Sequence, residues 1–168
     1  GGLSGTTATV LDCQGSGRGF RILWGHGKIY NMTVRNCHFS GIHIDGEGTS
    51  PTLAGLIVEQ CSSGDSGGGV MVLEQATPTF LNVVVQNNTA PGAGGGGLLV
   101  QGSGTNPRFE GCTFRSNQGG DYGGGGAYIC NGATPRFTNT TFEANVAPQG
   151  SGGGLWVHVT GTKPRFEG

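Results

Sequence analysis

The stretch FRSNQGGDYGGGGAYIC, residues 114–130, places a run of glycines between two short alternating runs. Such a glycine run is typical of a flexible linker, of a phosphate-binding loop or of one turn in a repeating structure. A phosphate loop needs a helix after the glycines and usually a lysine. Here residues 127–130 alternate as a strand does, and no lysine is near. Repetition along the chain decides between the two remaining alternatives.

The stretch recurs, and its recurrence predicts the fold. A Pro-x-Phe triplet marks the repeats and starts at Pro78, Pro107, Pro135 and Pro164, which gives a period of about 28–29 residues. Glycine runs keep the same period, at residues 67–69, 94–97, 123–126 and 152–154. Two markers with one period indicate a structural repeat and not a linker.

A third marker is a column of cysteine and asparagine. Its first members are Cys13, Cys37 and Cys61, at a period of about 24 residues. Its later members are Asn88, Asn117 and Asn145, which follow the period of the Pro-x-Phe triplets. We expect one domain over residues 1–168, with shorter coils of about 24–27 residues over 1–66 and regular coils of about 28–29 residues over 67–168. Because the last repeat stops partway and the first residues carry no initiator Met, we expect a segment of a longer β-helix protein.

Each repeat contains two or three short alternating stretches and no run with helical periodicity. Helical arrays are therefore excluded, and a propeller blade would need about 40 residues or more per repeat. A coil of a parallel β-helix fits, because it bends through short strands that pair with the next coil about 4.8 Å away. The sequence predicts an all-β, single-stranded parallel β-helix, a solenoid of about six coils.

Strand alternation assigns the two faces of each strand. The inward residues after the glycine runs are apolar throughout, and four phenylalanines are expected to stack inside: Phe80, Phe109, Phe137 and Phe166. An inward asparagine at the end of a strand uses its amide on turn backbone and on the asparagine one coil along. We expect the column of Cys13, Cys37, Cys61, Asn88, Asn117 and Asn145 to be such a structural ladder.

Cys37 and Cys61 are expected to be stacked thiols and not a disulfide. In-register side chains would hold their Cβ atoms about 4.8 Å apart, beyond the roughly 3.5–4.5 Å that a disulfide prefers. Strand parity leaves Cys130 outward, as the one candidate reactive thiol. No cysteine or histidine pair has zinc spacing, and we expect no metal and no cofactor.

Bulk composition excludes several partners. The chain has 37 glycines in 168 residues, 11% charged residues and a net charge of −1. The charge implies no attraction to nucleic acid. No apolar run approaches the roughly 20 residues of a membrane span, so we expect no direct membrane insertion.

The outward column that follows the glycine runs is the main candidate site. Coil by coil it reads Arg21, His43, Met71, Leu99, Tyr128 and Trp156, with Cys130 and His158 in the neighbouring column. An exposed apolar stripe usually marks an interaction site, and tyrosine and tryptophan suit sugar stacking or protein anchoring. We predict ligand binding by His43, Met71, Leu99, Tyr128, Trp156 and His158. Alternatively, an adjoining part of the parent chain covers this stripe.

Two further outward features are candidates. A cationic column comprises Lys28, Arg108, Arg136 and Arg165; pairing with neighbouring glutamates is favoured over contact with an anionic ligand. Glycosylation sequons begin at Asn31, Asn87 and Asn139.

The pairing of FRSN and FEAN with GGGGAYI and GGGLWV resembles the FxxN and GGA[ILV] motifs of polymorphic outer membrane protein repeats, over residues 67–168. That resemblance implies a right-handed parallel β-helix on a cell surface, associated with adhesion. The pectin-lyase-like superfamily shares this fold, and its enzymes cleave or bind polysaccharides.

We therefore expect an extracellular or cell-surface segment, structural or adhesive, that presents a binding face to a glycan or protein partner and not to nucleic acid. Any targeting signal would lie outside this segment. The alternative is a pectin-lyase-like polysaccharide lyase or glycoside hydrolase, for which His43, Asp45 and Arg21 are the nearest approach to an active site. The acidic residues are otherwise scattered over different coils, so we favour binding and assign no catalytic residue.

Overall fold

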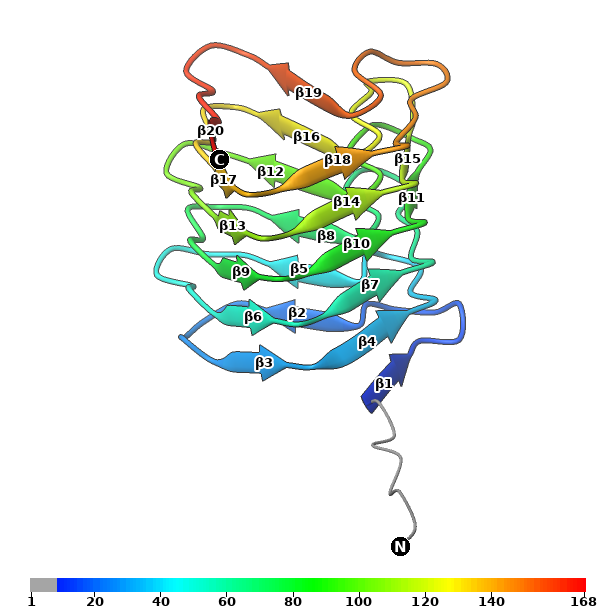
Figure 1. Cartoon of the computed structure of the whole chain (residues 1–168), viewed down its shortest axis with the longest axis vertical. Coiled ribbons are helices and arrows are strands. Elements are labelled where there is room, and N and C mark those ends of the chain that lie inside the picture. The colour runs from blue at the N-terminus through cyan, green and yellow to red at the C-terminus, as the bar shows by residue number, and fades with distance from the viewer. Residues whose placement is uncertain (1–8) are drawn as a thin grey trace, which may run out of the picture.

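The computed structural model describes residues 9–168 as a stack of short parallel strands arranged in three sheets (Figure 1). Residues 1–8 of the expected domain lie outside the described part. The stack makes about five turns of about 28 residues, and the expected six coils correspond to the six strands of each sheet. The fold predicted from the repeat is confirmed.

We name the sheets A, B and C. Sheet A contains β1 (Thr9–Asp12), β4 (Met32–Arg35), β7 (Ile57–Glu59), β10 (Val84–Gln86), β14 (Thr113–Arg115) and β18 (Thr141–Glu143). Sheet B contains β2 (Phe20–Ile22), β5 (Ile42–Ile44), β8 (Val70–Val72), β12 (Leu98–Gln101), β16 (Ala127–Cys130) and β19 (Leu155–His158). Sheet C contains β3 (Lys28–Tyr30), β6 (Thr52–Ala54), β9 (Thr79–Leu81), β13 (Arg108–Glu110), β17 (Arg136–Thr138) and β20 (Arg165–Glu167).

Each coil runs through sheets B, C and A in that order, and a turn then leads to the next strand of sheet B (Figure 1). In two neighbouring coils this turn adds a small pair of strands, β11 (Thr89–Ala90) and β15 (Gln118–Gly119). The turn from C to A contains one residue with positive φ, alternately asparagine and glycine, as at Asn82 and Gly111. A Cβ on Gly111 would lie 2.5 Å from Oδ1 of Asn82, so the asparagine side chain occupies the space that the glycine leaves free.

The core lies between the three sheets and is filled by the inward residues of every strand. Phe80, Phe109 and Phe137 are at most 1% exposed, and their rings stack with centroids 4.7 and 4.9 Å apart. Phe166, in the last described strand, continues the stack at 5.2 Å and is 56% exposed. A second stack joins Phe114 to Phe142 at 4.9 Å.

The asparagine column forms a hydrogen-bonded ladder at the end of sheet A. The Nδ2 atom of Asn88 donates to Oδ1 of Asn117 at 3.0 Å, and Nδ2 of Asn117 donates to Oδ1 of Asn145 at 3.0 Å. The same Nδ2 atoms donate to backbone carbonyls one coil back, at Val58 and Val85. Both buried amides are therefore satisfied, which burial requires.

The prediction that Cys37 carries a stacked free thiol is wrong, because Cys13 and Cys37 form a disulfide with their Cα atoms 4.8 Å apart. The N–H of Cys13 donates to the Arg35 carbonyl, as the N–H of Asn36 does to Glu59. Cys13 therefore stands one position before the column of Cys37 and Cys61, so the spacing argument for in-register side chains does not apply to it. Cys61 stays a buried free thiol.

Candidate functional site

The turns that lead into sheet B pack against its outer face, and their glycines allow this. A Cβ on Gly67 would lie 2.4 Å from Cγ of Met71 and 3.1 Å from Cβ of Leu99. A Cβ on Gly94 would lie 3.3 Å from the ring of Tyr128. Only glycine lets the turns approach the outward side chains so closely.

This packing corrects the prediction of a continuous exposed stripe. The register places the expected residues in one column, with Tyr128 beside Leu99 and Trp156 beside Tyr128. However, Leu99 is 3% exposed and His43 is 7% exposed. Met71 is partly buried. The exposed stripe is therefore wrong for the middle coils, since the glycine turns cover it there.

What remains at least partly accessible is a group of aromatic rings on and beside the last strands of sheet B, β16 and β19, which lie near the upper end of Figure 1. We name it the aromatic cluster: Tyr122, Tyr128, Trp156 and His158. The rings of Tyr128 and Trp156 stack at 4.8 Å, and Tyr122 lies 6.1 Å from Trp156. His158 follows at 5.0 Å from Trp156. The structure thus brings three of the six predicted ligand-binding residues together.

Tyr122 is the member that sequence reasoning missed. It is 56% exposed, although it belongs to a turn and not to the outward column. The signal was present in the decisive stretch, where Tyr122 is the one bulky residue within residues 119–126. Because the turn otherwise consists mostly of glycine, this exposed aromatic side chain is a candidate for contact with a partner.

Burial keeps the hydroxyl of Tyr128 in its neutral form. Desolvation, followed by the neighbouring Cys130, raises the pKa of Tyr128 to about 12. The phenol therefore remains a hydrogen-bond donor at any physiological pH.

The prediction that Cys130 is an accessible reactive thiol is wrong. Its residue is 2% exposed, and burial raises the pKa of its thiol. A protonated, buried thiol is a poor nucleophile. Parity does direct Cys130 away from the core, but it lies beside Gln101 and His158 in sheet B and is covered there.

His43 lies far down the column from the aromatic cluster, on β5. Its Nε2 atom is 3.7 Å from Oδ2 of Asp45, and neither ring nitrogen has a hydrogen-bond partner among the described residues. Burial, followed by the charge of Arg18, lowers the pKa of His43. The ring is therefore neutral and offers a buried acceptor nitrogen.

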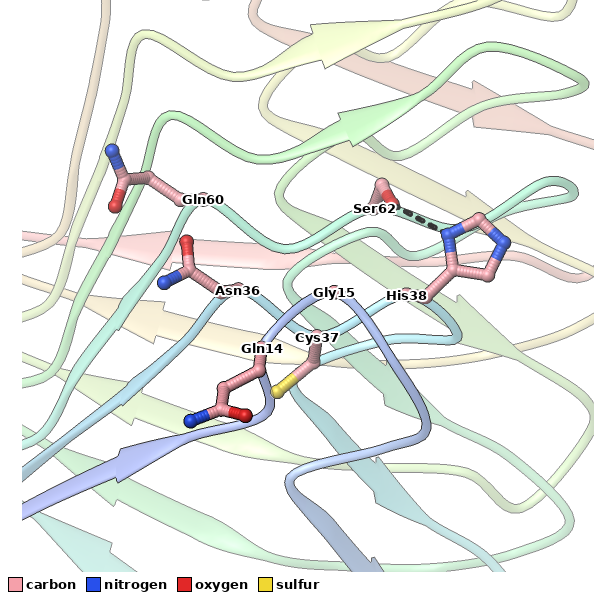
Figure 2. A pocket seen from close by; sticks show the side chains of 7 residues that line it. All are labelled: Gln14, Gly15, Asn36, Cys37, His38, Gln60 and Ser62. Carbon is pink, nitrogen blue, oxygen red and sulfur yellow. Dashed lines mark hydrogen bonds between the residues drawn. The ribbon is translucent and has the colours of Figure 1, made fainter.

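A shallow cavity of about 270 Å³ opens where the first coils turn from sheet A toward sheet B. Figure 2 shows the side chains that line it, with the hydroxyl of Ser62 3.4 Å from Nδ1 of His38. No carboxylate belongs to the lining, so the pair lacks the third group of a catalytic triad. The lining amides come from Gln14, Asn36 and Gln60, which share a positive φ after their strands.

The three sequon asparagines are exposed and occupy turns. Asn31 and Asn139 form corners between sheets C and A, and Asn87 follows β10. Glycosylation at these three positions stays a prediction.

Residues 9–168 contain no group of three or more His, Cys, Asp or Glu side chains placed to hold a metal ion. Nor does any helix there have the length and apolarity to cross a membrane.

Three parallel sheets, coil-by-coil register and a buried side-chain ladder define a parallel β-solenoid. The chain belongs to the right-handed β-helix family, because the family model described as right handed beta helix region matches residues 4–168. Comparisons with curated proteins and with solved structures found no match.

Proposed function

We propose that this β-helix is a binding scaffold that presents the aromatic cluster to a glycan. The observation that carries the proposal is the grouping of the partly exposed Trp156 with the exposed Tyr122 and His158. Flat rings with polar tips combine apolar contact and hydrogen bonding, which is what a sugar ring requires. A β-helix is a suitable support, because neighbouring coils hold each ring in register.

Within the cluster, Tyr122 and Trp156 are the better candidates for ligand contact. One face of Tyr128 is covered by Trp156, since the two rings are stacked at an interplanar angle of 14°. The other side of Tyr128 lies toward Leu99, its partner in β12. Tyr128 therefore supports Trp156, and Tyr122 is 56% exposed.

We further propose a surface or extracellular location. The Cys13–Cys37 disulfide points to an oxidising environment, because such bonds persist in extracellular and similar compartments. The similarity of residues 67–168 to polymorphic outer membrane protein repeats supports display on a cell surface.

A glycan array tests the proposal. We expect binding by the natural chain, and a loss of at least about tenfold in Tyr122→Ala and Trp156→Ala, since aromatic anchors dominate such contacts. Trp24→Ala is the matched control, because Trp24 is 82% exposed and lies in the turn after β2. Equal binding by Trp156→Ala and the natural chain would reject the cluster. If the chain binds proteins on a protein array and no glycan on the glycan array, the partner is a protein and not a glycan.

The second candidate function is a pectin-lyase-like polysaccharide-active enzyme. The observation in its favour is the neutral, unpartnered His43 beside Asp45, with Arg21 next to it in β2. Such a group serves as a general base where a substrate reaches it. Incubation with acidic and neutral polysaccharides, with and without calcium, tests this function. New chain ends that disappear in His43→Ala would establish it, and their absence with every substrate would remove it.

A further inference from the structure

A cationic cavity on the outer face of sheet C is separate from the aromatic cluster. It has a volume of about 270 Å³ and is lined by Asn106, Arg108, Thr134, Arg136, Lys163 and Arg165. We name these six residues the cationic face. Four of them are positively charged and none is acidic, which is unusual in a chain with a net charge of −1.

The face arises from one motif that recurs three times: NPRF at 106–109, TPRF at 134–137 and KPRF at 163–166. Residues two apart in an extended chain point to the same side. The residue before each proline and the arginine after it therefore both point outward, while the phenylalanine packs in the core stack. The proline restricts the backbone between the two outward side chains.

Strand pairing aligns the three copies. Arg108 lies opposite Arg136, and Arg136 lies opposite Arg165, in adjacent parallel strands. Stacked in this way, three guanidinium groups repel one another unless an anion neutralises them. Among the described residues the neutralisation is small: Glu167 Oε1 lies 3.7 Å from Nε of Arg136, and both side chains are at least 40% exposed.

We propose that the cationic face binds a tetrahedral oxyanion, a sulfate or phosphate group. Guanidinium groups offer planar, paired N–H donors that match the oxygens of such groups. The lysine, the asparagine amide and the threonine hydroxyl add donors, more than the two oxygens of a carboxylate can accept. The anion is either a free ion or an ester on a polysaccharide, and three aligned copies favour a polymer that carries several such groups.

The upstream coils indicate which substitution the arginine position tolerates. The arginine column continues as Thr79 and Thr52 in β9 and β6, so sheet C already accepts threonine at this position. Arg165→Thr removes one charge of the face, and the triple variant with Arg108→Thr, Arg136→Thr and Arg165→Thr removes three. Arg115→Thr is the control, because Arg115 is an exposed arginine on sheet A that the cavity does not include.

The experiment is calorimetric titration with three probes at constant ionic strength: inorganic sulfate, a sulfated oligosaccharide and the same oligosaccharide without sulfate. We expect the sulfated oligosaccharide to bind and the unsulfated one not to bind. Losing a charge-assisted contact should weaken binding about tenfold in Arg165→Thr. Arg115→Thr should stay within about twofold, since separated surface charges are screened. Binding of inorganic sulfate with comparable affinity would identify the free ion as the source.

Two results would overturn the proposal. The first is that neither inorganic sulfate nor the sulfated oligosaccharide binds. The second is that Arg115→Thr and Arg165→Thr weaken binding equally, because the attraction is then unspecific. Circular dichroism confirms the fold of each variant. If the triple variant does not fold, the comparison of Arg165→Thr with Arg115→Thr decides the outcome.

Discussion

Asn117 links three coils through one amide. Its Nδ2 donates to the Val85 carbonyl at 2.9 Å and to Asn145 at 3.0 Å, while its Oδ1 accepts from the backbone and side chain of Asn88. The residue is fully buried, so water cannot replace these partners.

Replacing this amide should therefore be costly. We expect Asn117→Ala to lower the free energy of unfolding by about 3 kcal/mol, because it leaves buried backbone groups unpaired. Urea denaturation followed by circular dichroism measures the change. Gln118→Ala, at an exposed neighbouring position, should cost about 0.5 kcal/mol or less. Similar losses in both variants would contradict the structural role of the ladder.

The buried thiols provide a second residue-scale prediction. Burial raises the pKa of Cys61 and of Cys112 to about 11. An exposed thiol has a pKa of about 8.5. The folded chain thus retains protons that the unfolded chain releases. The thiols' contribution to stability is fully present below about pH 8.5 and is lost as the pH rises toward about 11.

Alkylation at pH 8, read by mass spectrometry, tests this burial together with the disulfide. The native chain should resist labelling. In denaturant without reductant we expect labels on Cys61, Cys112 and Cys130 alone, because Cys13 and Cys37 are bonded. After reduction all five cysteines should react. Five labels before reduction would exclude the disulfide.

At the scale of elements, the turn into sheet B depends on glycine for space. A Cβ on Gly126 would lie 2.4 Å from the Gly154 carbonyl oxygen and 2.8 Å from Nδ2 of Asn145. Gly154 occupies the same place one coil later, and a Cβ there would meet nothing within 4 Å. The two positions form a matched pair.

We expect Gly126→Ala to destabilise the chain by roughly 2 kcal/mol or more, because neither backbone nor ladder has room to move. Gly154→Ala should be neutral within about 0.5 kcal/mol. Thermal unfolding of both variants measures the difference. A neutral Gly126→Ala would show that the glycine run is not required by packing.

The turn into sheet B also explains which parts of the structure the sequence predicted and which it did not. The repeat period and the strand alternation predicted the coils, the inward residues and the phenylalanine stack, because the same pattern recurs in every repeat. They did not predict that Leu99 is covered or that Tyr122 is exposed, since both depend on how a glycine turn folds over sheet B. The disulfide between Cys13 and Cys37 was not predicted, because it depends on a shift of one residue in the strand register of Cys13.

At the scale of the whole molecule, the coils in which the repeat is most regular carry both proposed surfaces. The aromatic cluster lies over β16 and β19 of sheet B, and the cationic face lies over β13, β17 and β20 of sheet C. A rigid solenoid can present different side chains on each sheet without altering its core, because outward and inward residues alternate. Function in such a chain resides in the outward columns.

Tryptophan fluorescence tests the central claim, the binding of a glycan at the aromatic cluster, most directly. The chain has two tryptophans, so Trp24→Phe leaves Trp156 as the sole tryptophan. Titrating this variant with the glycan selected on the array should give a saturable change in Trp156 emission, with the same midpoint as calorimetric binding. In a Tyr122→Ala background the midpoint should move at least about tenfold higher. Calorimetric binding with unchanged Trp156 emission would contradict the account.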